Sequence, residues 1–370
     1  MADLEYDAIL VDTSIFDGNG LKLESGLLGK LKQFAKSPVE FIMPDVIKNE
    51  IQTHLDRKIK VARNALEKSI NDAHDHLFFD GSALNTAKKL IVDSQEVEGL
   101  AKARLDKFID DTDAFIIDCD DYVSVKELLG VYFQNKPPFS ETGKKKNEFP
   151  DAIVLLAVEH WADKEGKKVL AVAKDKDWEA YCEHSKNIDY IEDFSKGLSK
   201  FNAATAPYAL LDNLKKALEE GNAAQFLSRV EFGLKSALDG FTPDQEADSQ
   251  HYWEAEGSHG WFESFTLCDY DFTIIDTDDD WIVIEVFADI TVGATGDFSL
   301  EGYDPIDRDN IPFGSISVST QEEFLSDILI TLSGNLNGDI NQLEVEDVEI
   351  VDPISSIDFG TLEINYVDYD

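Results

Sequence analysis

The chain has 370 residues, which is enough for two domains, and a formal net charge of −42 at pH 7. Its 43% apolar content is typical of a globular protein, and three scattered cysteines indicate neither a disulfide framework nor a zinc site. The N-terminus is acidic and no apolar run approaches the length of a membrane span, so we expect a cytoplasmic protein that makes no use of a membrane.

The negative charge is concentrated in the second half of the chain. Residues 1–200 contain 38 acidic and 28 basic residues, whereas residues 201–370 contain 37 acidic and 5 basic residues. A change of this size predicts a domain boundary, and an acidic surface of this kind repels phosphate backbones. Three roles remain open for the acidic part: binding a basic protein partner, screening a basic face of the first half, or solubility alone.

The first half alternates short apolar strands with helices. Strands are predicted at Asp7–Val11, Val39–Met43, Thr112–Ile117, Val169–Ala173 and, as an edge strand, Ile188–Ile191. Helices are predicted at Gly26–Ser37, from an Asp45 N-cap onward, at 56–110 with a turn at Gly81-Ser82, at Val123–Phe133, and from Pro150 to near Gly166. This order predicts an α/β domain over residues 1–200, with a parallel sheet, helices on both faces and a helical insertion at about 56–110.

The sequence pattern of the second half changes near residue 241, from one typical of helices to one typical of strands. Residues 201–240 predict a helical linker, with helices at Tyr208–Glu219 and Ala223–Leu238. Ile282 to Val292 then alternates apolar residues with others, as a strand with one buried face does. Further strands are predicted at Phe272–Ile275, Ser315–Val318, Ile328–Leu332, Leu343–Ile350 and Leu362–Val367. Residues 241–370 are therefore expected to form an acidic antiparallel all-β domain, either a sandwich or a partly open barrel.

Four carboxylates are predicted to meet at the carboxyl edge of the first sheet. Asp12 and Asp175 follow two predicted strands, Asp151 lies at a helix N-terminus, and Glu50 lies in an early helical turn. Ligands of open α/β sheets bind at this edge. Asp177 competes with Asp175 for the fourth position, and we favour Asp175 because it lies nearer the strand end.

Carboxylates that converge without a basic partner repel one another, and a hard divalent cation bound through oxygen relieves that repulsion. We therefore expect one or two Mg²⁺ or Mn²⁺ ions, which can activate a water and stabilise the oxygens of a phosphodiester undergoing displacement. The sequence has no P-loop, GxSxG, HExxH or GxGxxG motif that would indicate another chemistry.

Taken together, these residues resemble the PIN-domain nucleases. The four matching motifs are Val11-Asp12-Thr13-Ser14-Ile15-Phe16, Pro44-Asp45-Val46-Ile47-Lys48-Asn49-Glu50-Ile51, Glu148-Phe149-Pro150-Asp151-Ala152 and Lys174-Asp175-Lys176-Asp177-Trp178. The resemblance covers residues 5–195. The Tyr132-Phe133…Pro137-Pro138-Phe139 loop is similar to that of an uncharacterised bacterial subgroup with a C-terminal acidic β domain.

The resemblance implies a metal-dependent endonuclease that cleaves single-stranded RNA, as a toxin, defence or RNA-processing effector. Asp12, Glu50, Asp151 and Asp175 would be the catalytic metal ligands, with Asp177 as a further candidate. Two positions depart from the family pattern: Ser14 stands where Asn is usual and Ala173 where Thr or Ser is usual. Ser14 can still hydrogen-bond a ligand carboxylate, but Ala173 cannot.

Contacts to nucleic acid are predicted at basic residues near the site. Lys144, Lys145 and Lys146 form the main candidate for binding phosphates, and Lys174 is a further one. Two alternatives stay open: a nuclease for DNA or for a particular nucleic-acid structure, and a non-catalytic PIN scaffold whose acidic domain binds a protein. For Trp178 we favour packing under the sheet edge, with stacking on a base as the alternative.

Overall fold

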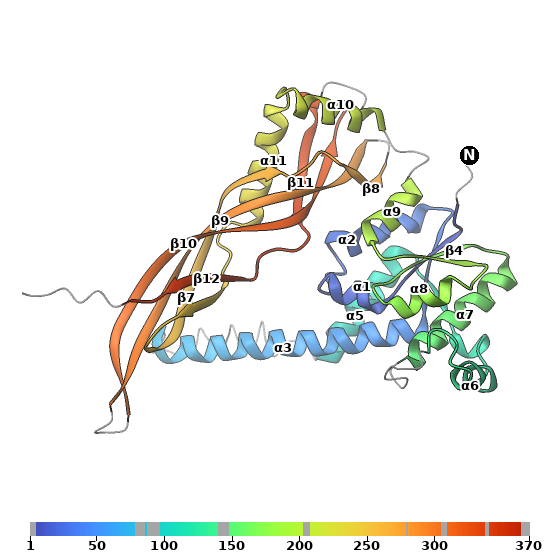
Figure 1. The fold of residues 1–370 in the computed structure, drawn as a ribbon, viewed down its shortest axis with the longest axis horizontal. Helices are drawn as coiled ribbons and strands as arrows, with labels where there is room; N and C mark the ends of the chain where they lie inside the picture. The colour runs from blue at the N-terminus through green and yellow to red at the C-terminus, as the bar shows by residue number, and fades with distance from the viewer. Residues whose placement is uncertain are drawn as a thin grey trace, which may run out of the picture. The chain divides into compact units, whose positions relative to one another are not determined.

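The computed structural model describes residues 5–77, 86, 97–139, 148–202, 208–278, 280–304, 309–336 and 340–363. The chain separates into two compact units, Met1–Ala204 and Thr205–Asp370. Figure 1 shows an α/β unit in blue and green and a β-rich unit in yellow to red. Within the described ranges, no helix is long and apolar enough to cross a membrane.

The first unit is built on a five-stranded parallel sheet with the strand order β3-β2-β1-β4-β5. Its strands are β1 (Ala8–Val11), β2 (Glu40–Pro44), β3 (Phe115–Ile117), β4 (Val169–Val172) and β5 (Ile188–Ile191). Every residue of β1 and β4 is buried, because the helices of this unit cover both faces of the sheet. The predicted parallel sheet, with β5 at one edge, is confirmed.

Helical segments connect these strands. They are α1 (Thr13–Gly18), α2 (Gly26–Gly29), the 3₁₀ helix η1 (Lys30–Lys36), α3 (Asp45–Leu77), α5 (Val97–Thr112), the 3₁₀ turn η2 (Cys119–Asp121), α6 (Val125–Phe133), α7 (Phe149–Glu165), α8 (Lys176–Cys182) and α9 (Phe194–Asn202). The helix expected at Gly26–Ser37 is split into α2 and η1. The expected turn at Gly81-Ser82 lies outside the described residues.

Two predicted boundaries were wrong. Asp45 is the first residue of α3 rather than its N-cap, and its Oδ1 accepts a hydrogen bond from the Cys119 N–H at 3.1 Å. Strand β3 is shorter than expected because α5 continues to Thr112, whose hydroxyl donates to the Phe108 carbonyl at 2.7 Å. In both cases the residue at the boundary contacts a distant or preceding segment, and local propensity does not report such contacts.

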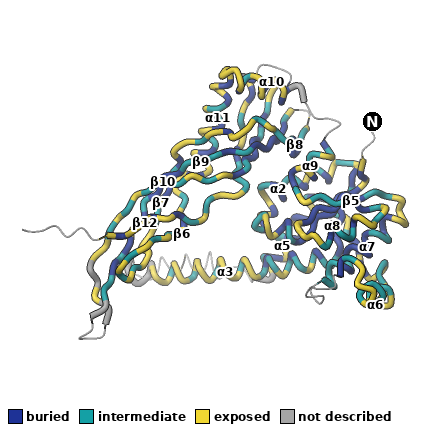
Figure 2. Tube along the Cα trace, viewed as in Figure 1, coloured by how far each residue is buried: buried dark blue, intermediate teal, exposed yellow. Residues whose placement is uncertain are grey.

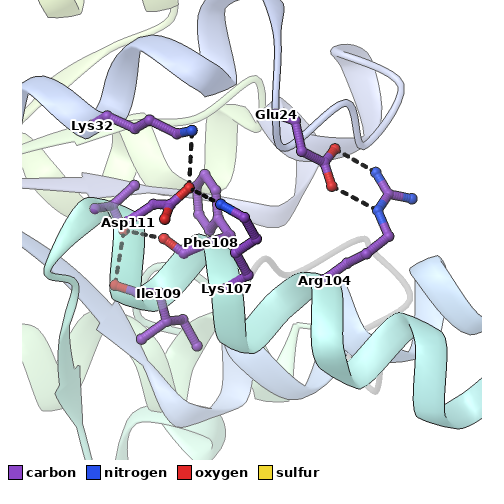
Figure 3. A network of polar contacts seen from close by, with 8 residues as sticks. Glu24, Lys32, Arg104, Lys107, Phe108, Ile109 and Asp111 are labelled. Carbon is purple, nitrogen blue, oxygen red and sulfur yellow. Dashed lines mark hydrogen bonds and ion pairs between the residues drawn. The ribbon is translucent and has the colours of Figure 1, made fainter.

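Helix α5, at the end of the predicted helical insertion (about residues 56–110), packs against the rest of the first unit (Figure 3). Arg104 donates two hydrogen bonds to the Glu24 carboxylate, at 2.8 and 2.6 Å. Asp111 accepts from Lys32 at 2.9 Å and from Lys107 at 2.5 Å. Beneath these ion pairs the Phe108 ring meets other buried rings edge to face. The partly exposed ion pairs contribute little free energy each, so burial of Phe108 is the main anchor.

Helix α7 begins and ends at the residues that the sequence indicates. Pro150 lies in its first turn, where the missing N–H costs no hydrogen bond, and Asp151 follows in the same turn. Gly166 ends the helix in the left-handed conformation, with φ of 66°, which glycine adopts without strain. This fixes Asp151 at the end of α7 that faces the carboxyl edge of the sheet.

The second unit contains one long antiparallel sheet with the order β11-β10-β9-β7, and β8 also pairs with β9. The strands are β6 (Asp244–Asp248), β7 (Tyr252–Leu267), β8 (Thr273–Thr277), β9 (Trp281–Asp304), β10 (Asp309–Ser333), β11 (Glu344–Ile350) and β12 (Ser356–Thr361). The antiparallel β architecture is confirmed. Separate strands expected at Ser315–Val318 and Ile328–Leu332 form the single strand β10, which pairs with β9 along its length.

One face of this sheet carries the core of the second unit. Helices α10 (Tyr208–Glu219) and α11 (Ala224–Ala237) place Leu214, Phe226 and Val230 in the same buried cluster as the inward residues of β9. A parallel two-stranded ribbon, β6 with β12, covers another part through contact of the Phe359 and Phe298 rings. Figure 2 shows that buried residues run along β9, interspersed with residues of intermediate exposure. The 3₁₀ turn η3 (Ile340–Gln342) precedes β11.

Residues 201–240 therefore differ from the helical linker that their sequence suggests. Both α10 and α11 belong to the second unit and contribute buried residues to its core. Helix α9, which was not predicted, ends the first unit by packing against β4 and β5, where Gly197 allows the close approach to Val172. The strand expected at Leu362–Val367 falls mostly outside the described residues, and β12 ends before it.

Candidate metal centre

Asp12 occupies the end of the central strand β1. Its backbone N–H donates to the Val172 carbonyl at 2.9 Å, which joins the ends of β1 and β4. Its side chain caps α1 by accepting from the Ser14 N–H at 3.0 Å, and only 6% of the residue is exposed. Burial raises the pKa of the Asp12 carboxyl, the Ser14 hydrogen bonds lower it, and the nearby Glu50 charge raises it again.

Glu50 reaches the same edge from the second turn of α3. Ile47 and Ile51 are almost fully buried and hold this turn against the sheet. The Thr13 hydroxyl donates to Glu50 Oε2 at 2.7 Å. Thr13 follows Asp12 directly, so this bond ties the first acidic motif to the second. The sequence suggested no role for Thr13.

Asp151, in the third motif, is held by Trp178 of the fourth motif. The indole N–H of Trp178 donates to Asp151 Oδ1 at 2.9 Å, and the indole is completely buried. The predicted packing of Trp178 under the sheet edge is confirmed, and its burial excludes stacking on a base. Burial raises the pKa of Asp151 to about 7, with further increases from the charges of Asp12, Asp175 and Glu50 against the lowering effect of Trp178.

Asp175 and Asp177 are linked to each other at the start of α8. Asp175 caps this helix by accepting from the Asp177 N–H at 2.8 Å, and its side chain is exposed at the sheet edge. Burial raises the pKa of Asp177, followed by the charges of Asp175 and Glu148. The charge of Asp175 also contributes to the raised pKa of Asp151. The preference for Asp175 over Asp177 as the fourth member of the site stays a prediction.

The donor set fits a hard divalent cation in its chemistry. The side chains of Asp12, Glu50, Asp151 and Asp175 offer only carboxylate oxygens, and none forms an ion pair with a described basic residue. As they stand, no three His, Cys, Asp or Glu side chains of the described residues surround one point closely enough to hold an ion. The residue types therefore suit Mg²⁺ or Mn²⁺, with the side chains spread along the edge rather than gathered.

The remaining predicted residues lie around this edge. Ser14 bonds to Asp12 and its Oγ accepts from the Lys174 N–H at 3.2 Å, so it joins the first and fourth motifs. Ala173 is fully buried beside it and offers no hydrogen bond from its side chain. Lys174 is exposed, and its Nζ lies 2.9 Å from the position that a Cβ on Gly18 would occupy. Lys144, Lys145 and Lys146 lie outside the described residues.

Trp178→Phe should keep a buried ring but remove the hydrogen bond to Asp151. We expect Mn²⁺ affinity to fall by about 10–100-fold, the usual cost of losing a residue that orients a metal ligand. Calorimetric titration of the full chain with Mn²⁺ measures the change. Trp161→Phe is the matched control, because Trp161 is also buried on an adjacent helix but makes no described contact with the carboxylates. Equal losses in both variants would mean that Trp178 acts through packing alone.

Comparison with known proteins supports the family assignment of the first unit. A family model described as the PIN domain matches residues 9–178, a span that contains all four acidic motifs. No curated protein and no solved structure matches the chain significantly. PIN domains are typically nucleases, which are hydrolases, and they generally use divalent metals. The match supports a PIN-type nuclease unit and ends well before the acidic second unit.

Proposed function

We propose that the chain is a divalent-metal-dependent endoribonuclease that cleaves phosphodiester bonds of single-stranded RNA. The observation that carries this proposal is the placement of Asp12, Glu50, Asp151 and Asp175 at the carboxyl edge of the first sheet. Burial first, and then the charges of the other three, raise the pKa of Asp151 there. Like charges along one edge are unfavourable by themselves and become favourable around a cation. Its position at the ends of β1 and β4 is where α/β sheets bind their ligands.

Asp12, Glu50, Asp151 and Asp175 would hold one or two Mg²⁺ or Mn²⁺ ions. When bound, such an ion lowers the pKa of water and neutralises charge on the phosphodiester. The other residues of the site keep the carboxylates in place: Thr13 fixes Glu50, Ser14 fixes Asp12, and Trp178 fixes Asp151. Asp12 and Trp178 are buried, whereas Asp175 is exposed to solvent.

A substrate panel tests this proposal. The full chain is incubated with end-labelled single-stranded RNA, single-stranded DNA and flap DNA, each with Mn²⁺, with Mg²⁺ and with a chelator. The proposal predicts internal cleavage of RNA that the chelator abolishes. Preferred cleavage of either DNA would support a DNA or structure-specific nuclease. No cleavage of any substrate, together with no thermal shift on adding metal, would support a scaffold without catalytic activity.

For the acidic second unit we propose recruitment of a basic protein partner. Arg308 is its only basic residue after Lys235, so its surface strongly favours positive ligands. Binding of a lysine-rich peptide to the full chain should be strong at low ionic strength and weaken steeply as salt screens the charges. Absence of binding at low ionic strength would contradict this role. A toxin, defence or RNA-processing pathway fits a nuclease that is delivered or restrained by such a partner.

A further inference from the structure

The second half of helix α3 is an exposed basic segment in a strongly acidic chain. Between Asp56 and Glu67 the sequence contains Arg57, Lys58, Lys60 and Arg63 and no acidic residue. The first half of the helix is anchored by Ile47, Ile51 and Leu55, which are at most 1% exposed. Beyond Leu55 the described residues of α3 are exposed or half-buried, as the colouring of this helix in Figure 2 shows.

The helical repeat places the basic residues in line with the candidate metal centre. At about 100° per residue, Arg57 and Lys68 fall within about 20° of Glu50 around the helix axis, and Lys60 lies about 80° from Glu50, on the flank of that face. Arg57 follows Glu50 by about 10 Å along the axis and Lys68 by about 27 Å, at about 1.5 Å per residue. Arg57, Lys60 and Lys68 are exposed and form no ion pair with a described residue. We call these three residues the α3 basic face.

Two lysines lie close to the turn that follows α1. Lys58 Nζ donates to the Gly20 carbonyl at 2.7 Å, and Lys174 Nζ lies 2.9 Å from the position that a Cβ on Gly18 would occupy. His54 contacts Asp17 at 2.9 Å and so fixes α3 to the end of α1. Both lysines are therefore near the glycine turn that directly follows the Asp12 motif.

We propose that the α3 basic face binds the phosphate backbone of the substrate single strand as it leaves the candidate metal centre. This inference rests on the proposed nuclease function and names the path of its substrate. Charge complementarity supports it, because a polyanion gains most from exposed cations that have no acidic partner. The length of the face also fits, because it runs about 27 Å beyond Glu50 and can contact several nucleotides of a strand, as OB folds do at about 4–16 nucleotides each. Val61, which is 64% exposed on the same face, offers apolar surface to a base.

The test measures binding of a fluorescent single-stranded RNA to the full chain by anisotropy, with a chelator present so that no cleavage occurs. The RNA is long enough to span the whole face. The double variant Arg57→Ser, Lys60→Ser should weaken binding by roughly 5-fold per lost phosphate contact at about 0.1 M salt. The dependence of log K on log salt should flatten by about 0.7 for each contact. Lys68→Ser should weaken binding of the long strand but not of a strand of about four nucleotides.

The matched control is the double variant Lys36→Ser, Lys186→Ser, which removes the same charge. Both lysines are exposed, and they precede β2 and β5 at the amino edge of the sheet, away from the carboxylates. If the control loses as much affinity as the α3 variant, or if the α3 variant binds like wild type, the basic face is not the path of the strand. If wild type itself binds no single strand, the proposed function fails as well.

Discussion

Asp151→Asn should reduce Mn²⁺-dependent cleavage by more than about a hundredfold, because loss of even a residue supporting a metal ligand costs about 10–100-fold. The substitution keeps the shape of the side chain and its acceptor oxygen for the Trp178 N–H, which is 2.9 Å away. It removes the negative charge that a cation requires. The fold should therefore persist, and single-turnover cleavage of end-labelled RNA measures the loss.

Asp177→Asn is the matched comparison for this prediction. Asp177 lies two residues from Asp175 and also carries a raised pKa, but its backbone N–H rather than its side chain contacts the Asp175 carboxylate. We expect its cleavage rate to stay within about tenfold of wild type, below the usual cost of a lost supporting residue. A greater loss in Asp177→Asn than in Asp175→Asn would assign the fourth position to Asp177.

The metal-free protein should lose stability as the pH rises towards 7. Burial and the surrounding carboxylates raise the pKa of Asp151 from 3.8 to about 7. A carboxyl that binds its proton more tightly in the folded state stabilises the fold fully below its unfolded pKa of about 3.9. That contribution is lost as the pH rises through the folded value, and it amounts to roughly 4 kcal/mol at most, at about 1.4 kcal/mol per pKa unit.

Urea unfolding of the full chain with a chelator, at a series of pH values, measures this effect. Other carboxylates titrate in the same range, so the comparison is with Asp151→Asn, which lacks this group. Wild type should lose more free energy of unfolding than the variant between about pH 4 and 7. Mn²⁺ added above pH 7 should restore the stability of wild type and leave the variant nearly unchanged. Identical pH profiles would mean that the folded protein does not raise the pKa of Asp151.

Much of the first unit could be predicted from sequence because its pattern is local. Short apolar runs identify buried strands, and parallel strands place their carboxyl ends at one edge, so Asp12 and Asp175 were expected to be neighbours. The hydrogen bonds that hold the site could not be predicted in the same way. The bonds from Thr13 to Glu50 and from Trp178 to Asp151 join residues 37 and 27 positions apart, and only the folded chain brings them together.

The second unit was harder to predict because its elements depend on their partners. The polar residues Ser319 to Glu323 interrupt the apolar pattern of β10, yet pairing with β9 continues through them, so two expected strands are one. Helices α10 and α11 are amphipathic, and amphipathicity alone does not reveal which surface buries the apolar face. The α3 basic face could not be predicted from the sequence either. Its alignment with Glu50 requires that α3 continue unbroken past the sheet, which only the structure shows.

Anomalous diffraction from crystals of the full chain soaked in Mn²⁺ tests the central claim most directly. The claim is that Asp12, Glu50, Asp151 and Asp175 together hold the ions that support cleavage. It predicts an anomalous peak at the carboxyl edge of the first sheet, at about 2 Å from oxygens of these four side chains. No peak at this edge under conditions that support cleavage, or a peak bound only by other residues, would contradict it.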